Sequence, residues 1–566
     1  MKLCIAGTGR VCLWLFLLAP FNSLFAATTA ADIQQNAAEI DAREQTRQQE
    51  RERALQQQNK TDSDIRLERP TATLPYYPLS ERPCFPIHTL RLNGDGAERF
   101  QWALKAAALA KGRCLGAQGI LLTINKVQNR ILEKGFVTTR VMAQEQDLTT
   151  GVLTLTLQPG RIDRIFFEPP VSWRARLWNA VPTASGDILN LRDIEQALEN
   201  FRRVPSVNAE IKIEPGRQEA TSDLAVDWRE SRPVHLNLGL DDSGAKSTGK
   251  YQGSATLSID APFAHNDLFY LSLGKDLLQP GPFASRSKTF NYSIPAGYWL
   301  FSANYNSYRY HQNIASANDT LTYSGESENA QLALSRLLFR NQSHKTTLNF
   351  RLWRRHSTNA VNGIDIGQQQ RRTAGWELGL NQRSYFGNAT VDANLNWRRG
   401  TGLFNARPAP EEQFGGGSAR ASIFTGDLSF NLPLSAAWRY NTSLRGQWSG
   451  DALTPQDRLS IAGRYTVRGF DGEQMLSGEK GAVWRNELAW NLLSGHELYW
   501  GVDYGRIAGP GARYLPAKAL TGSALGIRGA LWRWLSYDLF AGVPLAKPDG
   551  FHTSGVTGGF SVNLQL

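Results

Sequence analysis

The sequence predicts a transmembrane β-barrel of about 16 antiparallel strands, preceded by two small α+β modules and an N-terminal helix. Three observations support this fold class. Residues 232–566 form a series of short segments in which polar and apolar residues alternate, separated by Gly, Asn, Asp, Ser and Pro. Before them, residues 84–231 repeat one order of predicted elements twice. The chain begins with a stretch typical of secretory signal peptides.

That first stretch, residues 1–26, has a charged start and a short apolar core. Lys2 and Arg10 precede the run VCLWLFLLAPF, and the small residues of NSLFAA follow. This arrangement is typical of a cleaved signal peptide. The alternative, a membrane anchor, requires about 18 or more apolar residues. We therefore expect the mature chain outside the cytoplasm.

The segment 31–59 is rich in Ala, Gln, Glu and Arg and contains no Gly or Pro, which favours a helix. Such a helix is polar on all sides, so it cannot pack on a dry core. It lies either in bulk water or in a water-filled polar cavity, and the segment alone leaves both open. Residues 60–83 are polar and rich in proline, which is typical of an extended linker.

The first predicted module covers residues 84–159. After an extended start, we expect two helical windows, at about 98–111 and 119–133, because apolar residues of the second window share one face. The alternating VLTLTLQ at 152–158 predicts a half-buried strand.

The second predicted module covers residues 160–231 and repeats that order. It begins with the strand RIDRIFFE, followed by a short helix around Trp173–Asn179 and a longer one over 190–203, which Asn190 caps. The strands VNAEIKIEP and SDLAVDWRE close the unit. The repeat implies two α+β modules in tandem.

Two cysteines, Cys84 and Cys114, remain once the signal peptide is removed. An even number of cysteines in an oxidising compartment predicts a disulfide, and two free buried thiols are the alternative. The loop that this disulfide would close contributes about 3 kcal/mol to stability.

From residue 232 onward, the two faces of each segment differ, one being apolar and the other polar. In TVDANLNWR, Leu395 and Trp397 share one face, while Asn396 and Arg398 take the other. A water-soluble sandwich also alternates. However, the second face is rich in arginine and asparagine in several segments, and Trp and Tyr recur at segment ends. This is typical of a transmembrane barrel with a wet lumen and an aromatic girdle.

The formal net charge is +11. Nucleic acid is the usual partner for a basic chain, but the arginines here are spread over alternating segments, so we expect no nucleic-acid binding. A polar, arginine-lined interior or an anionic lipid surface fits this distribution better. Hydrophobic residues make up 41% of the chain, and the mean hydropathy is −0.37. A soluble protein has such values, and so does a transmembrane barrel, because its strands alternate.

One stretch, GAKSTGKY at 244–251, resembles a phosphate-binding loop. Tyr251 stands where that motif needs Ser or Thr for Mg²⁺, and the flanking segments are two strands, so we expect a hairpin instead. The sequence also shows no H-E-x-x-H, no G-x-S-x-G and no Cys/His cluster with metal-ligand spacing. We therefore expect no catalysis, no cofactor and no metal.

The stretch RYTVRGFDGE places Arg468 among glycines, as at a loop tip. Further on, WGVDYGRI places Asp503 between Gly501 and Gly505 on one strand face. Small residues beside an aspartate leave room for an incoming loop, so a charge-assisted pair of Arg468 with Asp503 inside a wet lumen is one interpretation. The alternative is two polar residues that each have their own neighbours.

Several stretches resemble the outer-membrane transporters of two-partner secretion, the exporters of haemolysins and of contact-dependent-inhibition toxins, which share a superfamily with the barrel-assembly insertases. The matching stretches are CFPIHTL, GRCLG, KGFVTTRV, EQDLTTGVLTLTLQPGRI, SIPAGYWLFS, RYTVRGF and GVDYGR. VRGF is similar to the superfamily's lid-loop signature, made here by Val467, Arg468, Gly469 and Phe470. The resemblance implies that this loop enters the lumen and that Arg468 pairs with Asp503.

The resemblance also implies the rest of the organisation. It makes 31–59 a plug helix, 60–83 a linker, 84–159 and 160–231 two polypeptide-transport (POTRA) domains in the periplasm, and 232–566 a barrel of about 16 strands. The site would be the outer membrane of a Gram-negative bacterium. The partners would be outer-membrane lipid, the barrel-assembly machinery that inserts the chain, and a secreted TpsA-type exoprotein bound through its N-terminal secretion domain.

The function expected from this resemblance is export of a large β-helical exoprotein, such as a haemolysin, adhesin or toxin, without ATP. GRCLG resembles the haemolysin-type branch, in which the exporter can also be needed for toxin activity. An insertase for other barrels is the main alternative, although insertases typically carry more POTRA domains and no plug helix. A passive porin is the third, and a porin does not need the two modules.

Overall fold

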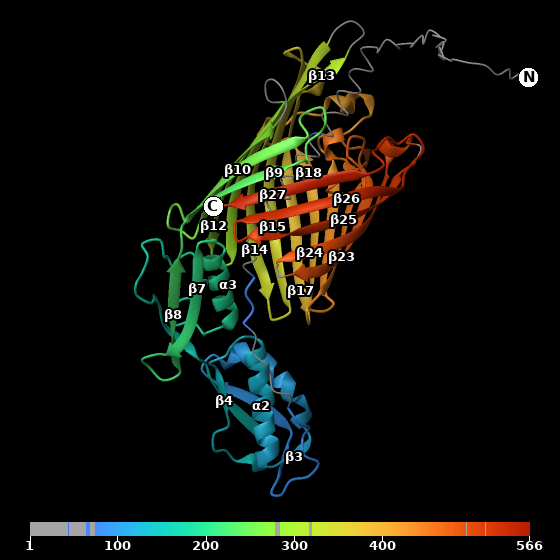
Figure 1. The fold of residues 1–566 in the computed structure, drawn as a ribbon. Coiled ribbons are helices and arrows are strands. Elements are labelled where there is room, and N and C mark those ends of the chain that lie inside the picture. Colours follow the sequence, from blue (N-terminus) through green and yellow to red (C-terminus); the bar gives the residue numbers. More distant parts are fainter. Residues whose placement is uncertain are drawn as a thin grey trace, which may run out of the picture.

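The computed structural model describes residues 44, 64–67, 74–277, 284–315, 320–493, 495–515 and 517–566. They form two small modules and a large barrel, which follow one another along the chain (Figure 1). The expected signal peptide at 1–26 lies outside the described residues. The expected plug helix at 31–59 also lies outside them, except for Glu44, and so does part of the linker at 60–83.

The first module packs helices on a small sheet of order β2–β5–β4, beside the separate strand pair β1–β3. Its elements are β1 (Phe85–Ile87), β2 (Thr89–Gly94), the 3₁₀ helix η1 (Ala97–Ala110), β3 (Arg113–Leu115), α2 (Ala117–Glu133), β4 (Arg140–Met142), the 3₁₀ turn η2 (Leu148–Thr150) and β5 (Val152–Gln158). The leucines, which stand at alternate positions of β5, are all buried, as the sequence pattern predicts. Both expected helices are present, the first as a 3₁₀ helix.

Cys84 and Cys114 form a disulfide at one edge of the first module. The bond ties the residue before β1 to β3, in which Cys114 lies opposite Pro86. The two cysteines are 30 residues apart in the sequence, so the closed loop includes the whole of η1.

Replacing both Cys84 and Cys114 with serine should lower the free energy of unfolding of the first module by about 3 kcal/mol, because the open chain regains loop entropy. The measurement is the urea concentration at which a protease begins to cut the first module in the full-length chain. The barrel should migrate unchanged on a gel. An unchanged urea midpoint would show that the disulfide does not stabilise the module.

The second module repeats this plan with a sheet of order β6–β8–β7. Its elements are β6 (Arg161–Phe167), α3 (Leu191–Arg202), β7 (Val207–Pro215) and β8 (Thr221–Glu230). The predicted cap of α3 is present, since the side-chain oxygen of Asn190 accepts a hydrogen bond of 2.9 Å from the backbone N–H of Arg192.

The short helix expected around Trp173–Asn179 was a wrong prediction, because these residues form turns and bends. The side chains of this loop do not share one helix face, because Arg174 pairs with Glu230 of β8 and Leu177 packs on the module's own core. Asn179 instead bonds to the barrel. The Asn179 amide donates to the carbonyls of His265 and, at 3.1 Å, Pro295. The backbone N–H of Gly297 in turn donates to the Asn179 carbonyl at 2.8 Å. This loop therefore fixes the second module to the barrel.

The remainder of the chain forms a closed antiparallel barrel of 16 strands (Figure 1). The strands are β9 (Val234–Asp241), β10 (Tyr251–Asp260), β11 (Leu268–Leu277), β12 (Ser285–Ala296), β13 (Trp299–Ala315), β14 (Thr320–Arg340), β15 (His344–Val361), β17 (Arg371–Phe386), β18 (Ala389–Thr401), β19 (Ser422–Pro433), β20 (Trp438–Ser449), β23 (Lys480–Leu493), β24 (His496–Ala508), β25 (Ala519–Trp532), β26 (Leu535–Ala546) and β27 (Thr557–Gln565). β27 pairs with β9, so the sheet has no free edge, as a lipid environment requires.

Short elements decorate the barrel loops. They are β16 (Ile364–Asp365), which pairs antiparallel with the end of β15, and the 3₁₀ turns η3 (Gly367–Gln369), η4 (Leu403–Asn405), η5 (Pro410–Phe414), η6 (Pro455–Asp457) and η7 (Pro510–Ala512). The stretch at 244–251 is the connection between β9 and β10, which pair antiparallel, so the expected hairpin is confirmed. Among the helices that the structure describes, none has the length and apolar character needed to cross a membrane.

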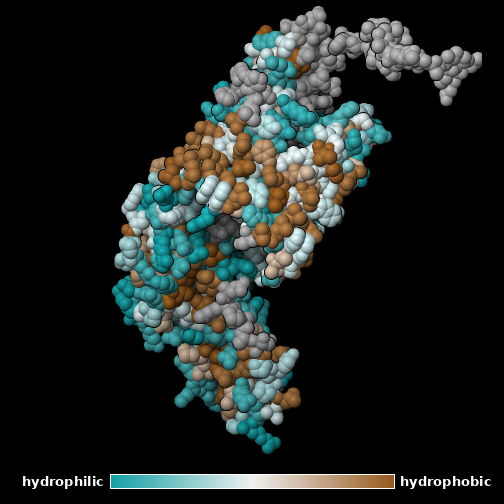
Figure 2. Space-filling view, in the orientation of Figure 1, coloured by the Kyte–Doolittle hydropathy of each residue, from teal (hydrophilic) through white to brown (hydrophobic). Residues whose placement is uncertain are grey.

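The two barrel faces differ as the alternation predicts. Leu395 and Trp397 of β18 are exposed on the outer wall, where Figure 2 shows apolar residues gathered over the barrel. On the inner face, the Arg398 guanidinium lies 3.1 Å from a carboxylate oxygen of Asp457. Apolar side chains thus face lipid, and charged side chains line the lumen.

Aromatic side chains gather at both ends of the outer wall. Near the end that carries the modules, the rings of Trp438 and Trp490 stack with centroids 5.8 Å apart. Near the opposite end, Trp397 and Phe424 stack at 5.9 Å. Two such girdles mark the two membrane–water interfaces.

Candidate functional site

Residues 450–479, which connect β20 to β23, fold back into the barrel, and we call them the lid loop. The loop contains a small hairpin of β21 (Leu459–Ile461) and β22 (Leu476–Gly478). Its apolar side chains Val467 and Phe470 are buried in a cluster with barrel residues such as Ile507. The loop is therefore packed against the inner wall.

Arg468 at the tip of the lid loop binds Asp503 of β24 through three hydrogen bonds. Its Nε donates to Oδ2 at 2.7 Å, its Nη2 to Oδ1 at 2.9 Å and its backbone N–H to Oδ2 at 3.0 Å. The same guanidinium donates from Nη1 to Glu487 Oε2 at 2.8 Å. Arg468 is only 4% exposed and Asp503 is 0% exposed. A bidentate, buried pair of this kind fixes both position and orientation.

Glycines on the inner wall make room for this loop tip. A Cβ on Gly501 would lie 2.2 Å from Arg468 Nη2, and one on Gly505 would lie 2.7 Å from a methyl carbon of Val467. Sequence reasoning found these two glycines but missed Gly522 of β25, where a Cβ would lie 1.8 Å from the Arg468 carbonyl oxygen. Gly469 itself has φ +100, a backbone conformation that favours glycine.

The substitution Gly522→Ala should displace the lid loop, because the new methyl group overlaps a backbone oxygen that cannot rotate away. Overpacking of this kind destabilises by about 1–3 kcal/mol. The measurement is the temperature at which the barrel loses its folded gel mobility, together with protease cutting within residues 450–479. Gly446→Ala is the control, because a Cβ at Gly446 would lie 3.9 Å from its nearest neighbouring atom. Equal behaviour of the two variants would contradict this packing.

Sequence reasoning also missed a chain of charges that continues from Arg468 along the inner wall. Arg528 donates to Glu487 at 2.6 Å and to Glu497 at 2.7 Å, and Glu497 also pairs with Arg439. Their alternation on β20, β23, β24 and β25 predicts that they face the lumen. The pairing itself depends on strand register, which the sequence does not reveal.

The lid loop also contacts the seam where the barrel closes. Arg464 donates to Asp242 Oδ1 at 2.8 Å and to the Phe560 carbonyl at 3.3 Å. The same Asp242 oxygen accepts from the backbone N–H of Phe560 at 2.8 Å. One loop therefore joins β24 to the ends of the first and last strands.

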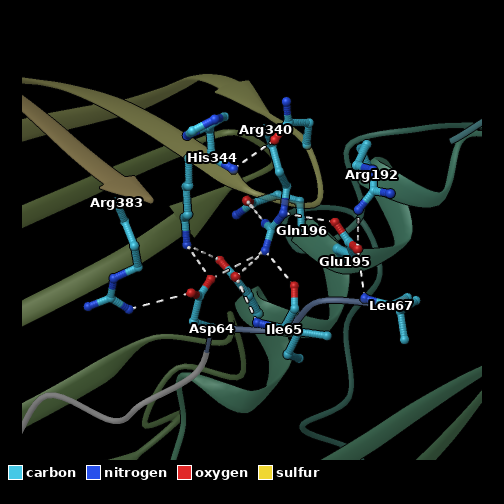
Figure 3. A network of polar contacts seen from close by, with 12 residues as sticks. Asp64, Ile65, Leu67, Arg192, Glu195, Gln196, Arg340, His344 and Arg383 are labelled. Atoms are coloured by element: carbon cyan, nitrogen blue, oxygen red, sulfur yellow. Dashed lines mark hydrogen bonds and ion pairs between the residues drawn. The ribbon is translucent and has the colours of Figure 1, made fainter. Parts of the chain in front are cut away.

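A second ionic site lies at the end of the barrel that carries the modules, and we call it the mouth cluster (Figure 3). It joins three parts of the chain: the linker, helix α3 of the second module, and barrel strands. Its charged members are Asp64, Arg192, Glu195, Glu199, Arg340, Lys345 and Arg383.

Arg340, at the end of β14, is the centre of the mouth cluster and its side chain is only 4% exposed. Its guanidinium donates to Glu195 at 3.0 Å, pairs with Glu199, and donates to the carbonyl of Ile65 at 2.8 Å. The linker is held from the other side too, because the backbone N–H of Ile65 donates to Glu199 at 3.0 Å. Linker and helix α3 are thus bound to the same barrel arginine.

The linker carboxylate Asp64 reaches two further cations. It lies 3.4 Å from Lys345 Nζ and 3.5 Å from Arg383 Nη1. Burial raises the pKa of Asp64, but its contact with Glu199 and the charges of Lys345, Arg383 and Arg340 outweigh burial and hold the pKa below its ordinary value. The mouth cluster therefore binds the linker with the Asp64 carboxylate ionised.

Glu44, the only described residue of the segment expected to form the plug helix, is helical and 3% exposed. Its carboxylate accepts a hydrogen bond of 3.0 Å from the hydroxyl of Tyr308 on β13. Tyr308 is buried on the strand face opposite to exposed Tyr305, so it points into the lumen. Glu44 itself therefore lies in the polar cavity rather than in bulk water.

Both ionic sites hold protein segments in place. Among the described residues, no group of three or more His, Cys, Asp or Glu side chains is arranged to bind a metal ion. The buried pairs link the lid loop to β24, and they link the linker and the second module to β14 and β15. Such an arrangement suits gating of a pore.

A closed outer-membrane barrel with an inward-folded loop and two periplasmic α+β modules defines a two-partner secretion transporter. The comparison with protein families agrees. The profile of the haemolysin secretion/activation protein ShlB/FhaC/HecB family matches residues 220–529, and the chain belongs to this family. A ShlB-type POTRA domain matches residues 85–160, and a second POTRA domain matches residues 161–215.

Individual relatives and solved structures support the same assignment. The outer membrane transporter CdiB-2 of Burkholderia pseudomallei (strain 1026b) is 35% identical, over 97% of this chain and 99% of the relative. The structure of CdiB from Acinetobacter baumannii is 31% identical with a TM-score of 0.82, and that of CdiB from Escherichia coli is 26% identical with a TM-score of 0.84. Each of these matches covers 93% of this chain and 99% of the solved structure's chain.

These findings confirm the expected localisation and class. The chain is an outer-membrane pore for two-partner secretion, with its POTRA domains in the periplasm. The insertase alternative is not better supported. The family is one of transporters, for which no enzymatic role is indicated.

Proposed function

We propose that this chain exports one large exoprotein of the contact-dependent-inhibition kind. The relatives named CdiB are 30–35% identical to this chain, against 25–27% for the hemolysin transporters, and this supports the choice. A CdiB transporter covers 97% of the chain at 35% identity, whereas the hemolysin transporter ShlB of Serratia marcescens covers 70% at 27% identity. An activating role toward a haemolysin has correspondingly less support.

The exoprotein first binds the POTRA domains through its N-terminal secretion domain. In the second domain, β7 lies at the edge of the sheet. The second half of this strand is exposed, including Lys212 to Glu214. An extended segment can add to such an edge by backbone hydrogen bonds. In the first domain, the edge strand β4 is partly covered, because the Gln128 side chain binds the backbone of Thr139 and Val141. We therefore assign docking to β7.

The docked chain then enters the lumen, where two contacts of the resting state stand in its way. Glu44 lies against Tyr308, and the linker that follows is held at the mouth cluster. Both contacts must break before an extended polypeptide can pass. Arginine and asparagine side chains along the wall give the passing chain water-like partners and no apolar surface to bind.

The lid loop acts as the lock of this pore. The observation that supports this role most strongly is the buried Arg468–Asp503 pair, which fixes the loop tip on the wall. Direction comes from folding of the exoprotein outside the cell, so that no nucleotide is consumed. The barrel is inserted by the barrel-assembly machinery, like other outer-membrane barrels.

The test of dedicated export is a comparison of secreted and surface proteins between the natural host with and without this chain. We expect one large exoprotein to disappear from the surface and the medium, while other outer-membrane barrels keep their abundance. Broad depletion of barrels would instead assign an insertase function. An unchanged set of secreted proteins would contradict the proposal.

A further inference from the structure

The loop between β6 and α3 of the second POTRA domain exposes large apolar side chains. Val171 is 54% exposed, Trp173 64% and Trp178 65%. Single exposed apolar residues are ordinary, but three within one short loop form a patch that usually has a partner. The rest of this domain buries its apolar residues in a core of its own.

This loop continues the lipid-facing surface of the barrel. The Trp178 ring meets the His265 ring edge-on, with centroids 5.5 Å apart, in the turn between β10 and β11. In the same turn, Phe263 is 66% exposed and packs against Tyr292 of β12 at 5.9 Å. Tyr292 shares the outer face of β12 with exposed Phe290. The patch therefore begins where the periplasmic girdle of the barrel ends.

The loop is also rigidly attached at this level. The Asn179 amide binds the carbonyls of His265 and Pro295, and the Asn266 amide donates to the Arg176 carbonyl at 3.0 Å. These bonds hold the backbone of the loop beside two periplasmic turns. The indole rings are consequently held close to the membrane surface on that side.

The chemistry of the patch matches a phospholipid interface. Tryptophan is enriched where headgroups meet acyl chains, because its ring is apolar and its N–H is polar. The Arg176 side chain is exposed beside the indoles, whereas Arg174, 4.8 Å from the centre of the Trp173 ring, is already paired with Glu230 at 2.6 Å. Cationic side chains beside indoles suit lipid phosphates.

From this geometry we propose that residues 171–178 form a membrane anchor. The indoles of Trp173 and Trp178 insert among the headgroups of the periplasmic leaflet and fix the second POTRA domain beneath the barrel rim. An exoprotein segment is the competing occupant of exposed aromatic rings. Lipid is favoured because the patch is continuous with the barrel girdle. The anchor does not depend on which exoprotein is exported, or on export itself.

Photo-crosslinking tests the anchor directly. The full-length chain carries p-benzoylphenylalanine in place of Trp173 and is reconstituted, without exoprotein, into bilayers of phosphatidylethanolamine and phosphatidylglycerol. Illumination should attach phospholipid at this position, as it should at position 263 of the girdle, with detection by mass spectrometry. Position 121 is the control, because Leu121 is 58% exposed but lies on the first POTRA domain; no lipid should attach there.

Two results would overturn the proposal. The first is lipid attachment at position 263 without attachment at 173. The second is attachment at 173 to an added exoprotein secretion domain and never to lipid, which would assign the patch to cargo. As a second measurement, the variant Trp173→Ser keeps the His265 contact of Trp178 and should increase deuterium uptake by the 171–178 loop in bilayers but not in detergent. If Trp173→Ser changes deuterium uptake by the same amount in bilayers and in detergent, the anchor would also be contradicted.

Discussion

Removing the Arg468 side chain should release the lid loop while the barrel stays folded. In Arg468→Ala, Asp503 loses its bidentate partner at 0% exposure, and Glu487 loses one of its two arginines. Breaking a buried pair by removing one partner costs up to about 3–5 kcal/mol. Arg485, whose Nε lies 3.8 Å from Asp503 Oδ2, offsets part of that cost. A change of about 3 kcal/mol shifts the balance between docked and released loop by roughly a hundredfold.

The measurement is protease cutting within residues 450–479 of the folded barrel, together with the temperature at which folded gel mobility is lost. The double variant Arg468→Ala with Asp503→Ala should recover part of the lost stability, because it removes both charges. The coupling energy of the pair is the stability change of the double variant minus the sum of the changes in Arg468→Ala and Asp503→Ala. Arg309→Ala is the control, since the Arg309 side chain is 67% exposed in its pair with Glu326, and an exposed pair contributes little. A lid loop that stays protected in Arg468→Ala would contradict its role as a lock.

Removing the Arg340 side chain should open the mouth of the pore. In Arg340→Ala, Glu195 and Glu199 of helix α3 lose a buried cation, and the carbonyl of Ile65 loses its donor. The cost should be smaller than that penalty of about 3–5 kcal/mol, because Glu195 keeps its ion pair with Arg192. Lys345 still pairs with Glu199 at 2.6 Å, so helix α3 remains partly attached. The linker, and with it the segment in the lumen, should therefore leave the barrel more often.

Ion conductance of single molecules in planar lipid bilayers measures this opening. We expect the open fraction of Arg340→Ala to exceed that of the intact chain by at least about tenfold, the shift that about 1.4 kcal/mol produces. Arg351→Ala is the matched control, because Arg351 pairs with Glu377 at 3.1 Å on the lumen wall and takes no part in the mouth cluster. Conductance of Arg340→Ala equal to that of Arg351→Ala would show that the mouth cluster does not retain the plug segment.

Elements whose residues alternate strictly could be predicted from the sequence almost to the residue. The run VLTLTLQ is β5, and TVDANLNWR lies within β18, because a period of two fixes which side chains face lipid or core. The Arg468–Asp503 contact was accessible for a different reason. Glycines at 501 and 505 leave room for an incoming loop, and the resemblance then favoured the pair over two polar residues that each have their own neighbours.

Contacts between distant segments could not be predicted in the same way. Arg340 and Ile65 are 275 positions apart, and nothing local to either residue encodes their bond. The helix expected around Trp173–Asn179 failed for the same physical reason, because barrel turns, and not a helix face, bind that loop. Register likewise decided that Glu487 lies opposite Gly501, within reach of Arg468.

The most direct test of the central claim, that an exoprotein passes through this lumen, is crosslinking during export. The chain carries p-benzoylphenylalanine either at position 396, whose Asn396 faces the lumen, or at the neighbouring position 395, whose Leu395 is 65% exposed on the lipid face. With the exoprotein identified by the secretion comparison, illumination during export should join it to position 396 and leave position 395 free of it. Normal export without any crosslink at 396 would contradict passage through the barrel.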